Sequence, residues 1–235
     1  MSVKELFEKN RYDMSDLREV FGHLRGENGC PWDRVQTHES IRANLIEETY
    51  EVVEAIDTSD FTLLREELGD LLLQVVFHAG IEEEQGTFTF DDVVSDVTDK
   101  LLRRHPHVFG DVKANDEDGA LNAWESAKLV EKTERKTTVD SMNAVPPSLP
   151  ALMRAQKIVK KAMKDSYSPA ALIADGARSL RALADLMESP ETAVSSELVG
   201  EALLAISAFS QVNEIDGELE LTKKSEQFIS SFKES

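Results

Sequence analysis

Several classes of protein are excluded by what this sequence has little of. Cys30 is the only cysteine among 235 residues, so an intrachain disulfide is impossible and a reducing compartment is expected. No apolar run is long enough to span a bilayer, and the charged segment 1–12 contains no signal-peptide core. Alternation of apolar and polar residues, which would indicate strands, is confined to residues 87–90. A cytoplasmic protein built from helices is therefore expected.

Positive charge is scarce as well. The chain has 45 acidic residues against 26 basic ones, which gives a formal net charge of −19. Such a surface repels the backbones of nucleic acids and anionic lipids, so neither a nucleic-acid polymer nor a membrane is an expected partner. A small anionic ligand is compatible with this charge if metal ions and local basic residues recruit it.

Helical periodicity dominates the rest of the sequence. Apolar residues recur at three- and four-residue steps in segments that glycine, proline or aspartate separates. These segments are 14–24, 41–56, 63–77, 93–102, 149–163, 172–187, 198–209 and 221–232. Residues 137–150 hold three of the seven prolines and show little periodicity, which is typical of a linker. The sequence thus predicts an all-α protein with a first domain at 1–136, a linker at 137–150 and a second domain at 151–235.

The most informative feature is a pair of carboxylate motifs at helical spacing. Glu47-Glu48-x-x-Glu51 is followed by Glu67-x-x-Asp70. The two motifs lie on consecutive predicted helices, and a short turn would fold these helices into a hairpin that brings the acids together. A solvated acidic face is the alternative interpretation of either motif taken alone.

The surroundings of the second motif favour a metal site. Glu67 and Asp70 share a helix face with Gln74 and His78, and apolar residues cover the rest of that helix. Buried carboxylates need partners, since like charges about 5 Å apart repel by about 3 kcal/mol at an effective dielectric constant near 20. Neither motif contains lysine or arginine. Oxygen-only ligands select a hard cation such as Mg²⁺, with Mn²⁺ as a substitute, and Mg²⁺ commonly shares its ligands with phosphates.

Basic residues gather at one place in this acidic chain. Lys100, Arg103 and Arg104 form a small group, and arginine suits phosphate because its fork binds two oxygens at once. A helix C-terminus that favours positive charge is the alternative reading. Trp124 and Lys128, four residues apart, would stack on a base and contact a phosphate, or would be a packing tryptophan beside an exposed lysine.

A further signal comes from six segments taken in order. They are GCPWDRVQT (29–37), EETYEV (47–52), EELGDLLLQVVFHA (66–79), RRHPHVFGD (103–111), AWESAK (123–128) and LPALMRAQKI (149–158). Together they closely resemble the MazG-type nucleoside triphosphate pyrophosphohydrolases. The resemblance covers most of the chain and is strong up to about residue 160.

This resemblance implies a fold, a reaction and a set of site residues. The fold would be a four-helix-bundle-like, all-α domain that forms a homodimer. The reaction would be magnesium-dependent hydrolysis of a nucleoside triphosphate between its α and β phosphorus atoms, which releases the monophosphate and pyrophosphate. The family's metal ligands fall on Glu48, Glu51, Glu67 and Asp70, and Glu47 would orient or deprotonate the attacking water.

Two other functions stay open at this point. One is a narrower dNTP or dUTP pyrophosphatase, because the side chains that select the base cannot be placed from the sequence. The other is a non-catalytic nucleotide sensor or interaction protein. A house-cleaning role, in which the enzyme removes noncanonical or excess nucleotides, would fit the first reading.

The second half resembles a degenerate copy of the first. Residues 67–86 match residues 198–217 in the position of a glycine, an acid and a pair of leucines. In this copy Leu198 stands where Glu67 does, Glu201 replaces Asp70, and no Glu-Glu-x-x-Glu motif lies upstream. The second domain is therefore expected to be helical but non-catalytic.

Overall fold

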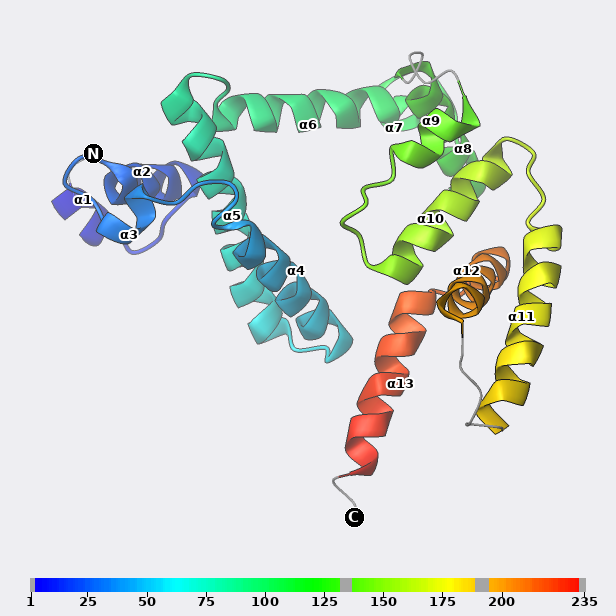
Figure 1. Ribbon diagram of the computed structural model, residues 1–235. Helices are drawn as coiled ribbons and strands as arrows, with labels where there is room; N and C mark the ends of the chain where they lie inside the picture. Colours follow the sequence, from blue (N-terminus) through cyan, green and yellow to red (C-terminus); the bar gives the residue numbers. More distant parts are fainter. Residues whose placement is uncertain (1–2, 132–136, 189–194, 233–235) are drawn as a thin grey trace. The chain divides into compact units, whose positions relative to one another are not determined.

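The computed structural model of the protein describes residues 3–131, 137–188 and 195–232 (Figure 1). All regular secondary structure in these ranges is helical, which confirms the all-α prediction. The chain divides into two compact units, Met1–Lys128 and Leu129–Ser235. This division falls ahead of the expected linker at 137–150, and part of that linker forms a short helix, α9 (Thr138–Asn143).

The first unit is organised around a helical hairpin. Its elements are α1 (Val3–Phe7), α2 (Met14–Arg25), α3 (Pro31–Arg34), α4 (Arg42–Asp57), α5 (Phe61–Gln85), α6 (Phe90–Arg104), α7 (Pro106–Phe109) and α8 (Glu117–Glu131), whose last residues pass the division. Helices α4 and α5 pack side by side as an antiparallel pair, and α5 also contacts α2 and α6.

Local signals define the ends of the long helix α5. Ser59, in the turn after α4, has a left-handed backbone with φ of 56°. The Asp60 side chain accepts hydrogen bonds from the backbone N–H groups of Thr62 and Leu63, as an N-cap should. Gly86 ends the helix with φ of 72°, a conformation that costs glycine little. These caps fix the hairpin that carries both carboxylate motifs.

The apolar core of the first unit surrounds the C-terminal half of α5. Its buried members are Phe21, Ile41, Val76, Phe77, Ala79, Ile81 and Phe90. Phe21 and Phe77 meet edge to face with ring centroids 4.9 Å apart. A Cβ atom at Gly80 would overlap the Phe21 ring, so glycine is needed for this close approach. The core therefore anchors the half of α5 that lies beyond the carboxylate motif.

The second unit is also purely helical in its described residues. After α9 it contains α10 (Ala151–Lys164), α11 (Ala170–Glu188), α12 (Ser196–Val212) and α13 (Gly217–Ser231). Helix α12 packs against α10, α11 and α13, and its buried face is made of small residues that include Ala202, Ala205 and Ala208. Gly176 of α11 lies against Ala205, where a Cβ atom would overlap.

Within the described ranges, none of the helices combines the length and the apolar character that a membrane crossing requires.

Candidate metal centre

Helices α4 and α5 bring three carboxylates to one point. Glu48 of α4 and Glu67 and Asp70 of α5 each offer an oxygen atom, and these atoms all lie within 4.8 Å of one another. Glu67 and Asp70 face the same neighbour because three residues make nearly one helical turn. We call Glu48, Glu51, Glu67 and Asp70 the carboxylate cluster.

Glu51 joins the cluster electrostatically, one turn after Glu48. Burial raises the pKa of Glu67, which is only 9% exposed, and the negative charges of Glu51 and Asp70 raise it further. Burial also raises the pKa of Glu48, followed by the charges of Asp70 and Glu51. The cluster thus concentrates negative charge that only a proton or a cation can neutralise.

The donor set of the cluster fits a magnesium ion. All of its donors are carboxylate oxygens, which Mg²⁺ and Mn²⁺ prefer over softer metals. Within the described part of the chain, no lysine or arginine forms an ion pair with any of the four carboxylates. The charge is therefore not balanced internally, as it would be in a structural ion-pair network.

Glu47, the residue that would act on the attacking water, lies at the edge of this arrangement. It precedes Glu48 on α4 and is exposed. It does not belong to the three carboxylates whose oxygens converge. Its role therefore stays a prediction.

The predicted substrate-binding residues come together in part. The Arg104 guanidinium lies 5.7 Å from the centre of the Trp124 ring, and the Lys128 amine lies 4.2 Å from it. Two cations therefore contact one tryptophan, although they are on different helices. Arg103 forms an ion pair of 2.9 Å with Asp99 one turn earlier on α6, and Lys100 is exposed on the same helix.

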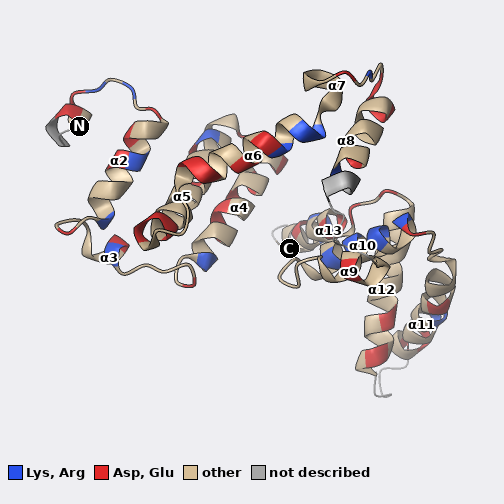
Figure 2. Cartoon of the chain, turned by 90° about the horizontal axis from the view of Figure 1, so that it is seen from above, with Lys and Arg blue, Asp and Glu red and all other residues tan. Residues whose placement is uncertain are grey.

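These basic residues occupy the C-terminal half of α6 and the helix α8, and no contact between them and the carboxylate cluster is observed in the described residues. Figure 2 shows acidic residues on α4 and α5 and basic residues at the end of α6. The single chain therefore presents an acidic group and a cation-rich group as separate features.

One group of residues at this hairpin was missed by the sequence reasoning. His38 Nδ1 lies 2.7 Å from His78 Nδ1, and His38 Nε2 lies 2.7 Å from Glu82 Oε1. The interaction with His38 lowers the pKa of Glu82, while burial and then the charge of His38 lower the pKa of His78. The four-residue spacing of His78 and Glu82 could have indicated that they share a face, but no periodicity places His38.

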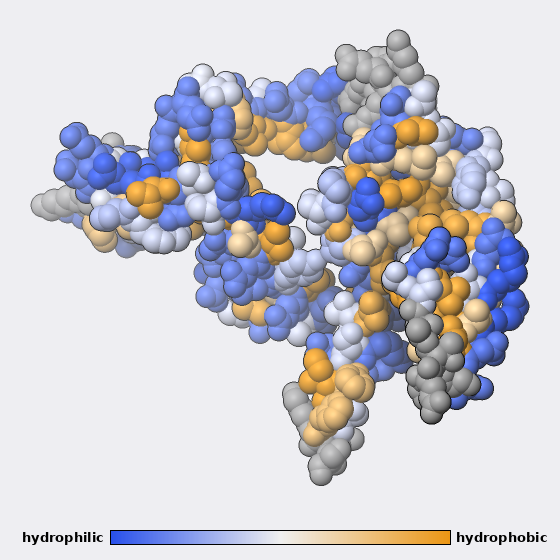
Figure 3. Space-filling view, viewed as in Figure 1, coloured by the Kyte–Doolittle hydropathy of each residue, from blue (hydrophilic) through white to orange (hydrophobic). Residues whose placement is uncertain are grey.

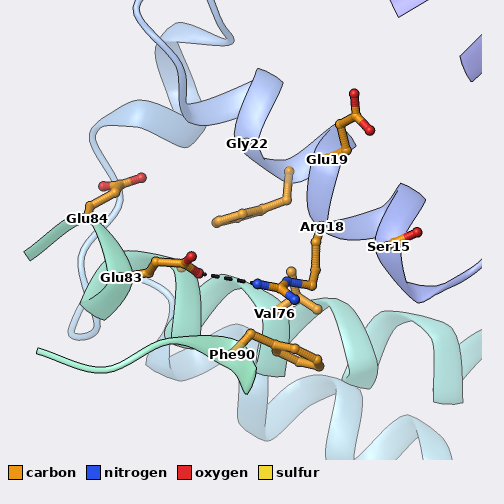
Figure 4. Close-up of a pocket in the computed structure, with 10 residues that line it drawn as sticks. Ser15, Arg18, Glu19, Gly22, Val76, Glu83, Glu84 and Phe90 are labelled. Atoms are coloured by element: carbon orange, nitrogen blue, oxygen red, sulfur yellow. Dashed lines mark ion pairs between the residues drawn. The ribbon is translucent and has the colours of Figure 1, made fainter. Parts of the chain in front are cut away.

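A hollow of about 420 Å³ lies elsewhere, between α2, α5 and α6 (Figure 4). Val76 and Gly80 contribute to its wall, and they lie across α5 from the face of the carboxylate motif. Arg18 in this hollow pairs with Asp91 at 2.7 Å and with Glu83 at 3.8 Å. Because its charge is already balanced, the hollow is not suited to bind the phosphates of a substrate.

In the second unit, the positions that correspond to the carboxylate cluster are joined by a hydrogen bond between a serine and a glutamate. Ser179 Oγ of α11 donates to Glu201 Oε2 of α12 at 2.7 Å. These residues are 22 apart in the chain, the same separation as Glu48 and Asp70. None of the described acids of this unit joins a group of three or more potential metal ligands. Glu201 thus has a neutral partner where Asp70 has other carboxylates.

Comparison with known proteins bears on the same residues. A family model for the MazG nucleotide pyrophosphohydrolase domain matches residues 36–109, which include the whole carboxylate cluster. The nucleoside triphosphate pyrophosphohydrolase/pyrophosphatase MazG of Thermotoga maritima is 38% identical over 221 residues, which are 93% of this chain and 83% of that protein.

Two further relatives extend the comparison. The nucleoside triphosphate pyrophosphohydrolase of Escherichia coli K12 is 39% identical over 213 residues, or 88% of this chain and 81% of that protein. The uncharacterized protein YabN of Bacillus subtilis is 48% identical over 149 residues, which are 63% of this chain and only 30% of YabN. The chain belongs, as its motifs predicted, to the MazG family of nucleotide pyrophosphohydrolases.

Proposed function

We propose that this protein hydrolyses nucleoside triphosphates to the monophosphate and pyrophosphate in a magnesium-dependent reaction. The observation that carries the proposal is the convergence of carboxylate oxygens from α4 and α5 within 4.8 Å. Two relatives that cover most of the chain are named nucleoside triphosphate pyrophosphohydrolases, which supports the choice of substrate. A house-cleaning role for this activity is part of the same proposal.

Each carboxylate has a proposed task. Glu48, Glu51, Glu67 and Asp70 would hold magnesium, which when bound neutralises developing charge on phosphate oxygens and makes a water molecule more acidic. Glu47 orients or deprotonates the attacking water from the exposed side of α4. A water nucleophile suffices for this hydrolysis, so Cys30 is given no catalytic role.

The basic residues would bind the anionic part of the substrate. Lys100, Arg103 and Arg104 present positive charge along one end of α6, and arginine binds two phosphate oxygens at once. The contact of Trp124 with Arg104 and Lys128 supports a platform on which a planar base stacks beside cations.

We propose further that the active form is a homodimer. Exposed apolar residues recur at helical steps on two elements of the first unit. They are Ile46, Tyr50 and Val53 on α4 and Val94, Val97 and Leu101 on α6. Figure 3 shows apolar side chains at the surface along α6. Burial of such stripes against a second copy would complete a helical bundle.

Product analysis tests the activity directly. The purified chain is incubated with each common NTP and dNTP, including dUTP, with and without Mg²⁺. Monophosphate and pyrophosphate that form only with the metal support the proposal, and a strong preference for dUTP would narrow it. Release of the nucleoside diphosphate and phosphate would contradict the proposed cleavage between the α and β phosphorus atoms. Tight metal-dependent binding without turnover would favour a nucleotide sensor instead.

Variants connect the reaction to the cluster. Glu67→Gln should abolish turnover, since it removes a buried metal ligand without changing the size of the side chain. Glu66→Gln is the matched control, because Glu66 is the exposed neighbour on the same helix and loses the same charge.

A further inference from the structure

The polar face of α5 continues past the carboxylate cluster. Gln74 and His78 follow Asp70 at steps of four residues and therefore lie on the same side of the helix. The helical rise places Gln74 about 6 Å and His78 about 12 Å beyond Asp70 along the axis. A line of polar groups thus leads from the cluster toward the C-terminal half of α5.

Both residues hold a buried polar atom without a partner. Gln74 is only 8% exposed, and its Oε1 atom accepts no hydrogen bond from any described residue. His78 Nε2, one turn further along α5, is also buried and has no hydrogen-bond partner among the described residues. Buried polar atoms are almost always hydrogen-bonded, so two orphans on successive turns of one face indicate groups that a ligand satisfies.

The orientation of the His78 ring is fixed from its other edge. Glu82 Oε1 accepts a hydrogen bond from His38 Nε2, and His38 Nδ1 faces His78 Nδ1 at 2.7 Å. When His38 is neutral, His78 Nδ1 is the donor of that bond and His78 Nε2 is left as an acceptor. When His38 carries a proton on both nitrogens, His78 Nε2 becomes a donor. In both states Nε2 is held in place as a hydrogen-bonding atom.

The chemistry of the two residues selects the type of ligand. Neither Gln74 nor neutral His78 carries positive charge, and the carboxylate cluster lies on the same face, so a phosphate is an unfavourable occupant. A second metal ion is also unfavourable, since His78 belongs to no group of three potential ligands among the described residues. An amide and an imidazole fit neutral donors and acceptors such as sugar hydroxyls and the polar edge of a base.

We propose that Gln74 and His78 form the subsite for the nucleoside part of the substrate. Gln74 binds at the level of the sugar and His78 binds the polar edge of the base, a contact that leaves the face of the base free to stack on the proposed Trp124 platform, while the phosphates lie at the carboxylate cluster. The axial spacing of the three positions matches the order of phosphate, sugar and base in an extended nucleotide. This inference rests on the proposed function and assigns two specificity-determining residues to it.

The test compares selectivity across nucleotides. Values of kcat/KM are measured for ribo- and deoxynucleoside triphosphates of each common base, for the full chain and for Gln74→Leu and His78→Gln. Gln74→Leu should change the ratio of ribonucleotide to deoxynucleotide by about tenfold, the usual effect of one lost hydrogen bond. His78→Gln should change the ratios among bases by a similar factor. Mn²⁺ binding, measured by electron paramagnetic resonance, should stay unchanged in both.

Gln85→Leu is the control, since this residue is exposed at the end of α5 and makes the same chemical change. An equal loss for every nucleotide, or no loss at all, would overturn the proposal. If Gln74→Leu and the isosteric Gln74→Glu both lose their circular dichroism signal, Gln74 is structural and the proposal is also wrong. If the wild-type chain shows no hydrolysis, the proposed function fails separately, and the same ratios are then measured as Kd values for non-hydrolysable triphosphates.

Discussion

Magnesium should stabilise the first unit against heat, and this gain should depend on Glu67. At a hundred times its dissociation constant, an ion that binds only the folded state adds about 2.7 kcal/mol to the free energy of unfolding. The cluster lies wholly within Met1–Lys128, so the gain belongs to the unfolding of this unit. For a unit of this size, such a gain raises Tm by about 10 °C.

The assay follows thermal unfolding by circular dichroism with and without Mg²⁺. Sodium chloride at equal ionic strength is included, because salt screens the repulsion within a chain of net charge −19. We expect Mg²⁺ to raise Tm by the full amount in the wild type and in Glu66→Gln. In Glu67→Gln, Mg²⁺ should raise Tm little more than sodium chloride does. A shift of the same size in Glu67→Gln would refute the assignment of the cluster as the metal site.

The pH dependence of the same measurement follows from the raised pKa values of Glu48 and Glu67. Between their ordinary and raised pKa values, the folded metal-free protein binds more protons than the unfolded chain. Stability without metal should therefore rise as pH falls through this window, and the gain from Mg²⁺ should disappear there because protons compete with the ion. Glu67→Gln should weaken both trends in Tm.

Three other predictions concern packing and assembly. Gly80→Ala should destabilise the first unit by about 1–3 kcal/mol in urea unfolding, because the new Cβ overlaps the Phe21 ring. Ser179→Ala should cost about 1 kcal/mol of stability through its lost hydrogen bond, while Glu201→Gln leaves turnover unchanged. Val97→Asp should convert a dimer to a monomer in light scattering, since Val97 lies in the exposed apolar stripe of α6.

Matched variants control these three experiments. Gly22→Ala in α2 meets no atom within 4 Å and should stabilise rather than destabilise. Glu197→Gln changes an exposed acid of α12 without removing the bond to Ser179. Ser95→Asp adds the same charge to α6 away from the apolar stripe. Lost turnover in Glu201→Gln would show that the second unit takes part in the reaction, and a Val97→Asp protein that stays dimeric would contradict the proposed interface.

The helices and the approach of Glu48, Glu67 and Asp70 to one another could be predicted because both depend on local geometry. A period of 3.6 residues fixes which side chains share a helix face, and two helices joined by a short turn pack as an antiparallel hairpin. The sequence therefore places Glu67 and Asp70 opposite the first motif, and the oxygens of Glu48, Glu67 and Asp70 converge in the structure.

Features that depend on the path of a loop could not be predicted. His38 precedes α4 outside any periodic segment, so only the folded chain brings it to His78 and Glu82. The meeting of Arg104 with Trp124 depends in the same way on the course of residues 105–116 between α6 and α8.

Part of the expected linker at 137–150 forms the short helix α9, which its composition does not predict. The prolines of this segment are typical of a linker. Thr137 and Asp140, however, form the reciprocal hydrogen bonds of a capping box, and these begin α9.

The division of α5 into an anchored half and a charged half has a consequence for motion. Apart from Glu67, its buried residues lie at position 74 and beyond, whereas α4 buries only Ala55. Apart from Ala55, the end of the hairpin near Ser59 has no buried apolar residue to resist local opening, so its amide hydrogens should exchange faster than those near Phe77. Ion binding at the cluster then adds a further link between two helices that already pack side by side. Metal binding at the cluster and ordering of the hairpin are therefore thermodynamically coupled, so that each favours the other.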